Sequence, residues 1–195
     1  MSEVEKQKSP KRILDAAARL LRENGIDATS VADVMTAAGM THGGFYRHFS
    51  SKEDLVGAAL EHAAATVLGP VESKGAGEAR AVAVDAYIAD YLSDAHRRRR
   101  AEGCPLAALA GEALREDGRV REAAEHAARR TACLLSEGSG GDDAPDDLGL
   151  STLAVLMGSI VLARLLRDEE DAKRVLALGR TTVDLLEARY GAVDP

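Results

Sequence analysis

The stretch that decides the fold is TSVADVMTAAGMTHGGFYRHFSSKEDL, residues 29–55. A hydroxyl side chain at its start can cap a short helix, whose apolar residues recur at helical spacing. Gly39, in Ala38-Gly39-Met40, permits the left-handed backbone of a tight turn. A second helix is predicted from Thr41 to Phe49, and a third follows at once. The pattern is a helix-turn-helix, a motif that places its second helix in the major groove of DNA.

The second helix of this motif opens with small and polar residues. Phe45 and Phe49 are four apart and are predicted to pack inward. Two glycines cost an α-helix about 1 kcal/mol each relative to alanine, which suits close approach to DNA; simple irregularity is the alternative. Hydroxyls and amines can contact phosphates, although the hydroxyls could act as caps alone and Tyr46 could be half-buried. The predicted DNA-binding residues are Thr29, Ser30, Thr41, His42, Gly43, Gly44, Tyr46, Arg47, His48 and Lys52.

Three short motifs carry a resemblance to a known family. Ala38-Gly39-Met40 is followed by Tyr46-Arg47-His48-Phe49 and by Lys52-Glu53-Asp54-Leu55. With this spacing, the segment from about Lys11 to Leu60 resembles the DNA-binding domain of the TetR family of bacterial regulators. Met35 departs from the family pattern, which more often has alanine there, and could slightly shift the angle between the two helices.

The resemblance implies more than a DNA-binding head. The C-terminal domain of the family is helical, binds a small molecule and dimerises through its last two long helices. A homodimer would then place two recognition helices on a near-palindromic operator in double-stranded DNA. Effector binding would move the helix after the motif and release the protein, as expected of a repressor. A transcriptional activator with the same head remains an alternative.

The whole chain is predicted to be all-α, with about nine helices. Residues 1–9 are expected to be a disordered tail, 10–51 the helix-turn-helix domain and 52–195 the effector-binding and dimerisation domain, with a flexible loop at 136–147. Beyond the motif, helices are predicted at 10–23, 52–68, 78–97, 106–115, 120–135, 148–167 and 170–190, with a break at Gly69-Pro70.

Composition narrows the class of protein. Hydrophobic residues make up 46% of the 195 residues, aromatic residues only 3%, and tryptophan is absent, which favours an Ala- and Leu-rich helical core. The net charge is −7, and all of the net negative charge lies beyond the nearly neutral first fifty residues. No apolar run of about 18 residues predicts a membrane span. With no secretory signal at the N-terminus, we expect a cytoplasmic protein without membrane contact.

The last two predicted helices are apolar over a wide arc. Such an arc can pack on its own core and on a second chain, and an ordinary core helix is the alternative. The predicted dimer-interface residues are Leu156, Gly158, Ser159, Ile160, Val175, Leu178, Thr182 and Leu185.

Effector contacts are harder to assign from sequence. Tyr87 and Tyr91 share a helix face in a chain with few aromatic residues, although structural packing explains each equally well. The candidate pocket residues are His62, Tyr87, Tyr91, Cys104, His126, Cys133 and Met157.

The two cysteines and the arginine run have alternative roles. Cys104 precedes Pro105 at a predicted helix start, where a thiol can become reactive; a redox- or electrophile-responsive regulator is therefore an alternative, against an inert thiol. Residues 97–100 are four arginines, which we interpret as a solvated helix end paired with acids such as Asp94, with a second nucleic-acid patch as the alternative. No metal site, cofactor or catalytic constellation is expected, and hence no enzyme.

Overall fold

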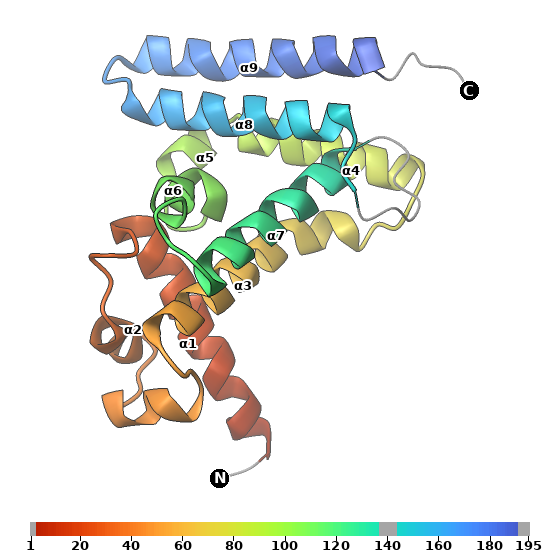
Figure 1. The fold of residues 1–195 in the computed structure, drawn as a ribbon. Helices are drawn as coiled ribbons and strands as arrows, with labels where there is room; N and C mark the ends of the chain where they lie inside the picture. Colours follow the sequence, from red (N-terminus) through yellow and green to blue (C-terminus); the bar gives the residue numbers. More distant parts are fainter. Residues whose placement is uncertain (1–2, 137–143, 191–195) are drawn as a thin grey trace. The chain divides into compact units, whose positions relative to one another are not determined.

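The computed structural model describes residues 3–136 and 144–190 and confirms the all-α prediction, since every regular element in these ranges is a helix (Figure 1). Nine are α-helices, and η1 is a 3-10 helix. Their bounds are α1 Glu3–Asn24, α2 Val31–Ala37, η1 His42–Arg47, α3 Lys52–Glu72, α4 Glu78–Tyr91, α5 Asp94–Arg98, α6 Pro105–Ala113, α7 Arg119–Leu135, α8 Asp147–Leu165 and α9 Glu169–Tyr190.

The chain forms two compact units. The first comprises Met1–Thr66 and Arg100–Ala127, and the second comprises Val67–Arg99 and Ala128–Pro195. Helices α3 and α7 each contribute one part to either unit. The division differs from the expected boundary after residue 51, because the start of α3 and all of α6 share a core with α1 and α2.

The structure departs from the sequence prediction in the helix before the motif and in the motif's second helix. Helix α1 begins at Glu3 rather than at Pro10, so the backbone is helical where a disordered tail was expected. The recognition element η1 is a 3-10 helix and not an α-helix. Gly43 and Gly44 have low α-helical propensity, and 3-10 geometry is common in such short segments.

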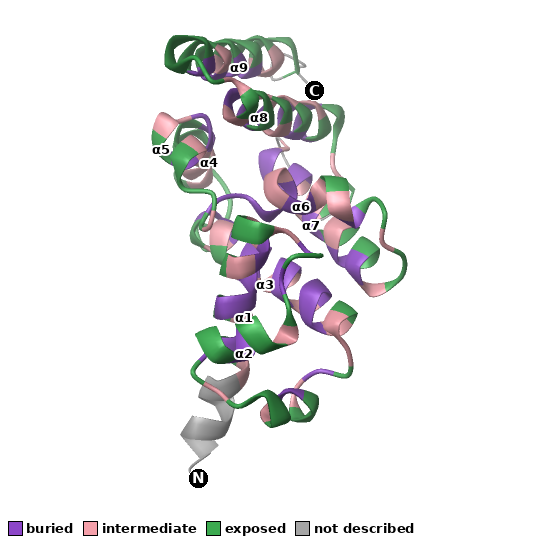
Figure 2. Ribbon diagram, turned by 90° about the vertical axis from the view of Figure 1, so that its left-hand side faces the viewer, coloured by how far each residue is buried: buried purple, intermediate pink, exposed green. Residues whose placement is uncertain are grey.

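The first unit is held together by an apolar core. Ile13, Met35 and Phe45 are each at most 1% exposed, and residues of α3, α6 and α7 complete the same cluster. In Figure 2, buried and exposed positions both occur within helices of this unit, as expected of helices that turn one face to a core.

Two helix boundaries in the middle of the chain were predicted wrongly. Helix α3 continues through Gly69-Pro70 to Glu72, where the sequence suggested a break. The helix predicted over 78–97 is divided into α4 and α5, because the Ser93 side chain caps α5 by accepting a hydrogen bond from the His96 backbone N–H at 3.0 Å.

Helices α8 and α9 form an antiparallel hairpin in the second unit (Figure 1). Gly179 of α9 lies so close to the Ser159 side chain of α8 that a Cβ there would overlap it. By length and mean hydropathy, 1.9, α8 could cross a membrane; 39% of that window is buried inside the protein, and one such helix is weak evidence for a membrane span. The acidic loop predicted at 136–147 falls largely on residues 137–143, outside the described part.

Candidate functional site

The turn of the motif has the geometry that its sequence predicts. Gly39 has φ +66°, and the Met40 N–H donates to the Met35 carbonyl at 2.9 Å. The Arg12 guanidinium on α1 donates to the Ala38 carbonyl at 2.5 Å. A long-range contact thus fixes the turn that orients η1 against α2.

The start of α2 is fixed by a capping box. The Ser30 side chain accepts from the Asp33 N–H, and the Asp33 carboxylate accepts from the Ser30 N–H at 3.1 Å. The Ser30 hydroxyl also donates to the Asp33 carboxylate at 2.5 Å, and this bond, together with the one from the Ser30 N–H, holds the pKa of Asp33 below its usual value. Thr29 is only 3% exposed, and its hydroxyl donates to the Gly25 carbonyl at 2.7 Å. Thr29 is thus buried and structural, which corrects its assignment as a phosphate contact.

Helix η1 presents a polar face beside an aromatic anchor. Phe45 and Phe49 are buried and stacked, with ring centroids 5.9 Å apart. Tyr46 is 72% exposed, which excludes the half-buried alternative. The other predicted base-reading side chains, His42 and Arg47, are exposed as well. The two aromatic rings fix the helix on the core and leave its opposite face open.

The remaining predicted DNA contacts flank this face. Thr41, Gly43 and Ser30 are exposed, whereas Gly44, His48 and Lys52 are half-buried. Thr41 makes no side-chain capping bond, so its hydroxyl is not engaged as a cap. A Cβ at Gly43 would meet nothing within 4 Å; the fold therefore does not require glycine there.

The contacts that tie α6 and the residues just before it to the base of the motif were not predicted from the sequence. The Glu112 carboxylate accepts a hydrogen bond from the Ile26 N–H at 2.6 Å. Arg22 of α1 donates to the Gly103 carbonyl at 2.9 Å. The two residues of each pair are more than eighty positions apart in the sequence, so no local sequence pattern predicts the contact.

A bidentate ion pair joins α3 to α7 in the first unit. Both terminal nitrogens of Arg119 donate to Glu61 at 2.8 Å, and this pair lowers the pKa of Glu61. Gly57 faces Arg119 so closely that a Cβ would overlap it. The contact therefore combines charge with tight backbone packing.

The predicted pocket residues of the first unit, His62, Cys104 and His126, are not among the residues that line the groove of the second unit described below. The His62 ring contacts the Asp15 carboxylate at 2.6 Å, and His126 is exposed on α7. Cys104 is 4% exposed at the start of α6. Burial lowers the pKa of the nearby Arg22 guanidinium, and the charge interaction with Cys104 partly offsets this effect.

The second unit contains a groove of about 790 Å³ between α3 and α4. Tyr87 is the one predicted pocket residue among its lining residues. Tyr91 is buried at 2% exposure, and Cys133 and Met157 are half-buried elsewhere in the unit. The groove residues that the sequence did not indicate are Val67, Pro70, Val71, Lys74, Glu78, Ala79, Val82, Ala83, Ala86 and Asp90.

An aromatic chain leads from this groove into the core. The Tyr87 and Tyr91 rings meet edge to face at 5.8 Å, and the Tyr91 ring meets His96 at 4.7 Å. His96 Nδ1 lies 2.7 Å from the Tyr91 carbonyl; because a carbonyl only accepts, Nδ1 carries the proton. Burial lowers the pKa of His96.

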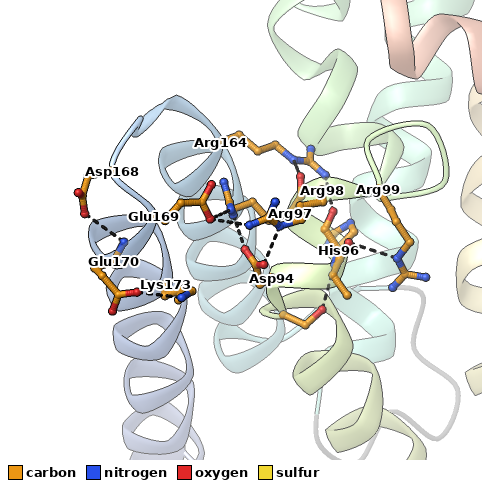
Figure 3. A network of polar contacts seen from close by, with 12 residues as sticks. Asp94, His96, Arg97, Arg98, Arg99, Arg164, Asp168, Glu169, Glu170 and Lys173 are labelled. Atoms are coloured by element: carbon orange, nitrogen blue, oxygen red, sulfur yellow. Dashed lines mark hydrogen bonds and ion pairs between the residues drawn. The ribbon is translucent and has the colours of Figure 1, made fainter.

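Three arginines of the run, Arg97, Arg98 and Arg99, form ion pairs within the second unit (Figure 3). Arg97 contacts Asp94 at 2.6 Å and Glu169 at 2.5 Å, and Arg98 contacts the same two carboxylates. Arg164 of α8 donates to the His96 carbonyl at 3.2 Å. The pairing with Asp94 confirms the predicted helix-end role, and Glu169 is a partner the sequence did not suggest.

Helices α8 and α9 carry exposed apolar side chains. Leu178 and Leu185 of α9 are 56% and 67% exposed. Thr182 of α9 and Gly158 of α8 are exposed as well. Further exposed apolar residues on α8 are Val161, Leu162 and Leu165.

The other predicted interface residues lie deeper. Leu156 and Ile160 are 0% exposed within the single chain, which corrects their assignment: they are core residues with no side-chain surface for a partner. Ser159 and Val175 are half-buried.

Two family models match the chain. Residues 13–59 match bacterial regulatory proteins of the tetR family. Residues 81–177 match the LmrA/YxaF-like transcriptional regulator C-terminal domain. The first match contains the whole motif and the first turns of α3. The second runs from α4 into α9 and contains most of the groove's α4 wall.

Curated relatives and solved structures agree with these matches. The HTH-type transcriptional regulator Rv0196 of Mycobacterium tuberculosis is 33% identical over 168 residues, 80% of this chain and 84% of the relative. A TetR regulator from Chloroflexus aurantiacus is 26% identical, with a TM-score of 0.70 over 92% of this chain and 96% of that one. Escherichia coli NemR in its reduced form shares the fold, at 22% identity and a TM-score of 0.66 over 89% and 96% of the two chains. The chain belongs to the TetR family of DNA-binding transcriptional regulators.

Proposed function

We propose that the protein is a homodimeric repressor that reads a near-palindromic operator with η1 and is released by a small molecule. The observation that carries the proposal is the exposed face of η1, where His42, Tyr46 and Arg47 project beside two buried phenylalanines. Arginine is the commonest reader of guanine in the major groove, and exposed hydroxyls bind phosphates. The site of action would be the cytoplasm, where the operator DNA lies.

The α8–α9 hairpin supports the dimer. Exposed α8 residues Ala154, Gly158, Val161 and Leu165 are spaced by four, three and four positions, and exposed α9 residues Leu178, Thr182 and Leu185 continue that rhythm. This heptad-like spacing is typical of helices that pack on a partner helix. A second copy of the chain would bury these residues in a four-helix interface.

Repression is supported by relatives that match the motif. The HTH-type transcriptional repressor Rv3405c of Mycobacterium tuberculosis is 46% identical over 50 residues, about a quarter of either chain. A bound effector would act by preferring one arrangement of the two units, because ligands shift populations by differential affinity. Helices α3 and α7, each shared between the units, are the proposed connections.

Dimerisation is tested by placing charged side chains on the exposed apolar face of the α8–α9 hairpin. In the double variant Leu178→Asp, Leu185→Asp, sedimentation should give the mass of a monomer and operator affinity should fall at least about tenfold, because two half-sites are no longer held together. Leu114→Asp is the matched control, since Leu114 is 66% exposed just after the end of α6. A dimer that survives the double substitution would refute this interface.

Repression itself is tested by transcription in vitro from the promoter of the protein's own gene. Addition of the protein should lower the transcript yield in proportion to operator occupancy. A rise in yield at the same occupancy would instead identify an activator.

A further inference from the structure

We propose that the groove between α3 and α4 binds an apolar molecule carrying one cationic group, with its apolar part against Val71 and Val82 and its cation at Tyr87 and Asp90. Only the identification of this ligand as the effector rests on the proposed function. All lining residues belong to the second unit.

The hollow arises from small residues on one helix face. Ala79, Ala83, Ala86 and Asp90 are spaced by four, three and four positions along α4, so they share one face. Three alanines in that row leave space that larger side chains would fill. A volume of about 790 Å³ lies within the range of small-molecule sites.

The walls of the groove are apolar. Val67, Pro70 and Val71 come from α3, and Val82 is 64% exposed on α4. Covering an exposed valine in a concave apolar surface with an apolar ligand is favourable, because apolar surface is removed from water. Pro70 belongs to this wall because α3 continues past it, against the break that the sequence suggested.

Charge is distributed unequally between the two ends. Lys74 and Glu78 flank the turn between the helices and balance each other, whereas Asp90 lies at the other end of the α4 row. The lining therefore carries a net charge of −1, from one lysine and two acids. Asp90 places a carboxylate at this end of the groove.

Tyr87 and Asp90 together suit a cation. Cations bind to the face of an aromatic ring, and a carboxylate nearby adds charge attraction. Arg99 donates to Asp90 at 3.0 Å, but both side chains are about half or more exposed, and ion pairs screened by water are weak. A ligand cation can therefore share or take over this carboxylate.

The absence of tryptophan from the chain permits a local fluorescence test. Tyr87→Trp places one reporter in the groove and keeps an aromatic face. Ala89→Trp is the control, because Ala89 is exposed on the same helix but does not line the groove. The probes are decyltrimethylammonium, decanol and decanoate, which share a tail and differ in charge.

The cation should shift the emission of the Tyr87→Trp protein and leave that of Ala89→Trp unchanged. Its affinity should exceed that of decanol at least about threefold, with decanoate weakest. Asp90→Asn in the reporter background should lower the cation's affinity by a similar factor, and Arg99→Gln should raise it. Asp85→Asn is the matched control, since Asp85 is an exposed, ion-paired acid of α4 outside the groove.

Equal responses from both reporters, or decanoate binding as tightly as the cation, would overturn the proposal. The emission measurement needs no DNA, so failure of operator binding would refute the proposed function without touching the groove. Probe binding that leaves the operator complex intact would refute the groove's role as the effector site.

Discussion

The Glu112 carboxylate of α6 accepts a hydrogen bond from the backbone N–H of Ile26 at 2.6 Å, across 86 positions of the sequence. The same oxygen lies 3.4 Å from the Asp27 nitrogen. Ile26 and Asp27 belong to the segment between α1 and α2. Glu112 therefore anchors the entrance of the helix-turn-helix to α6.

Replacement of this anchor should weaken the fold and the DNA-binding unit together. We expect Glu112→Ala to lower the free energy of unfolding by about 1–3 kcal/mol, because the part-buried Ile26 N–H loses a charged acceptor. Thermal unfolding followed by circular dichroism measures the change. Glu116→Ala, a half-buried acid just beyond α6, is the control and should change stability by less than about 0.5 kcal/mol.

Gly39 should tolerate no side chain. Its φ of +66° is unfavourable for alanine by about 1–2 kcal/mol, and a Cβ would lie 2.7 Å from the Arg12 guanidinium that holds the turn. Urea unfolding of Gly39→Ala should show a loss of at least about 1 kcal/mol. In Gly69→Ala, where the helix leaves open space, stability should instead rise by about 0.5–1 kcal/mol; equal effects of the two substitutions would contradict the account.

His96 should make stability depend on pH. Burial lowers its folded-state pKa below the ordinary 6.5, so its contribution is fully present above 6.5 and is lost as the pH falls through the lower folded value. Tyr91, Asp90 and Arg99 precede or follow it in the chain, and Arg164 faces it from α8. Protonation adds charge beside two arginines.

Thermal unfolding at pH 7.5 and 5.5 measures this dependence. The wild type should lose more stability over that interval than His96→Asn, whose amide can still donate to the Tyr91 carbonyl but does not titrate. Identical losses in the two proteins would show that His96 is not the group responsible.

The helix-turn-helix could be predicted from sequence because its signals are local. The Ser30 cap, the glycine turn and the Phe45–Phe49 spacing each act within a few residues, and all three appear in the structure. The 3-10 form of η1 was missed, since two glycines weaken an α-helix without specifying the alternative.

Contacts between segments that are far apart in the chain could not be predicted from the sequence. The role of Glu112 and the burial of Thr29 depend on segments that meet only in the fold. Tyr87 was the one groove residue predicted from the sequence as an effector contact. The alanines that create the hollow could not be recognised, because alanine is also an ordinary helix-forming residue. Leu156 and Ile160 were assigned to the dimer because periodicity identifies an apolar face but not which side of it a partner would cover.

The measurement that tests the central claim most directly is DNA binding by variants of η1. Fluorescence anisotropy with labelled DNA from upstream of the gene, at two salt concentrations, would compare the wild type with Arg47→Ala and Gly43→Ala. Arg121→Ala, an exposed arginine of α7, is the control. Gly43→Ala is informative because a Cβ there meets nothing within the protein.

The account predicts specific, salt-sensitive binding by the wild type and the control. Arg47→Ala should lose about 1–3 kcal/mol of specific affinity, and Gly43→Ala should bind more weakly while unfolding at an unchanged or higher temperature. Undiminished binding by both η1 variants would contradict the claim that this helix reads the operator.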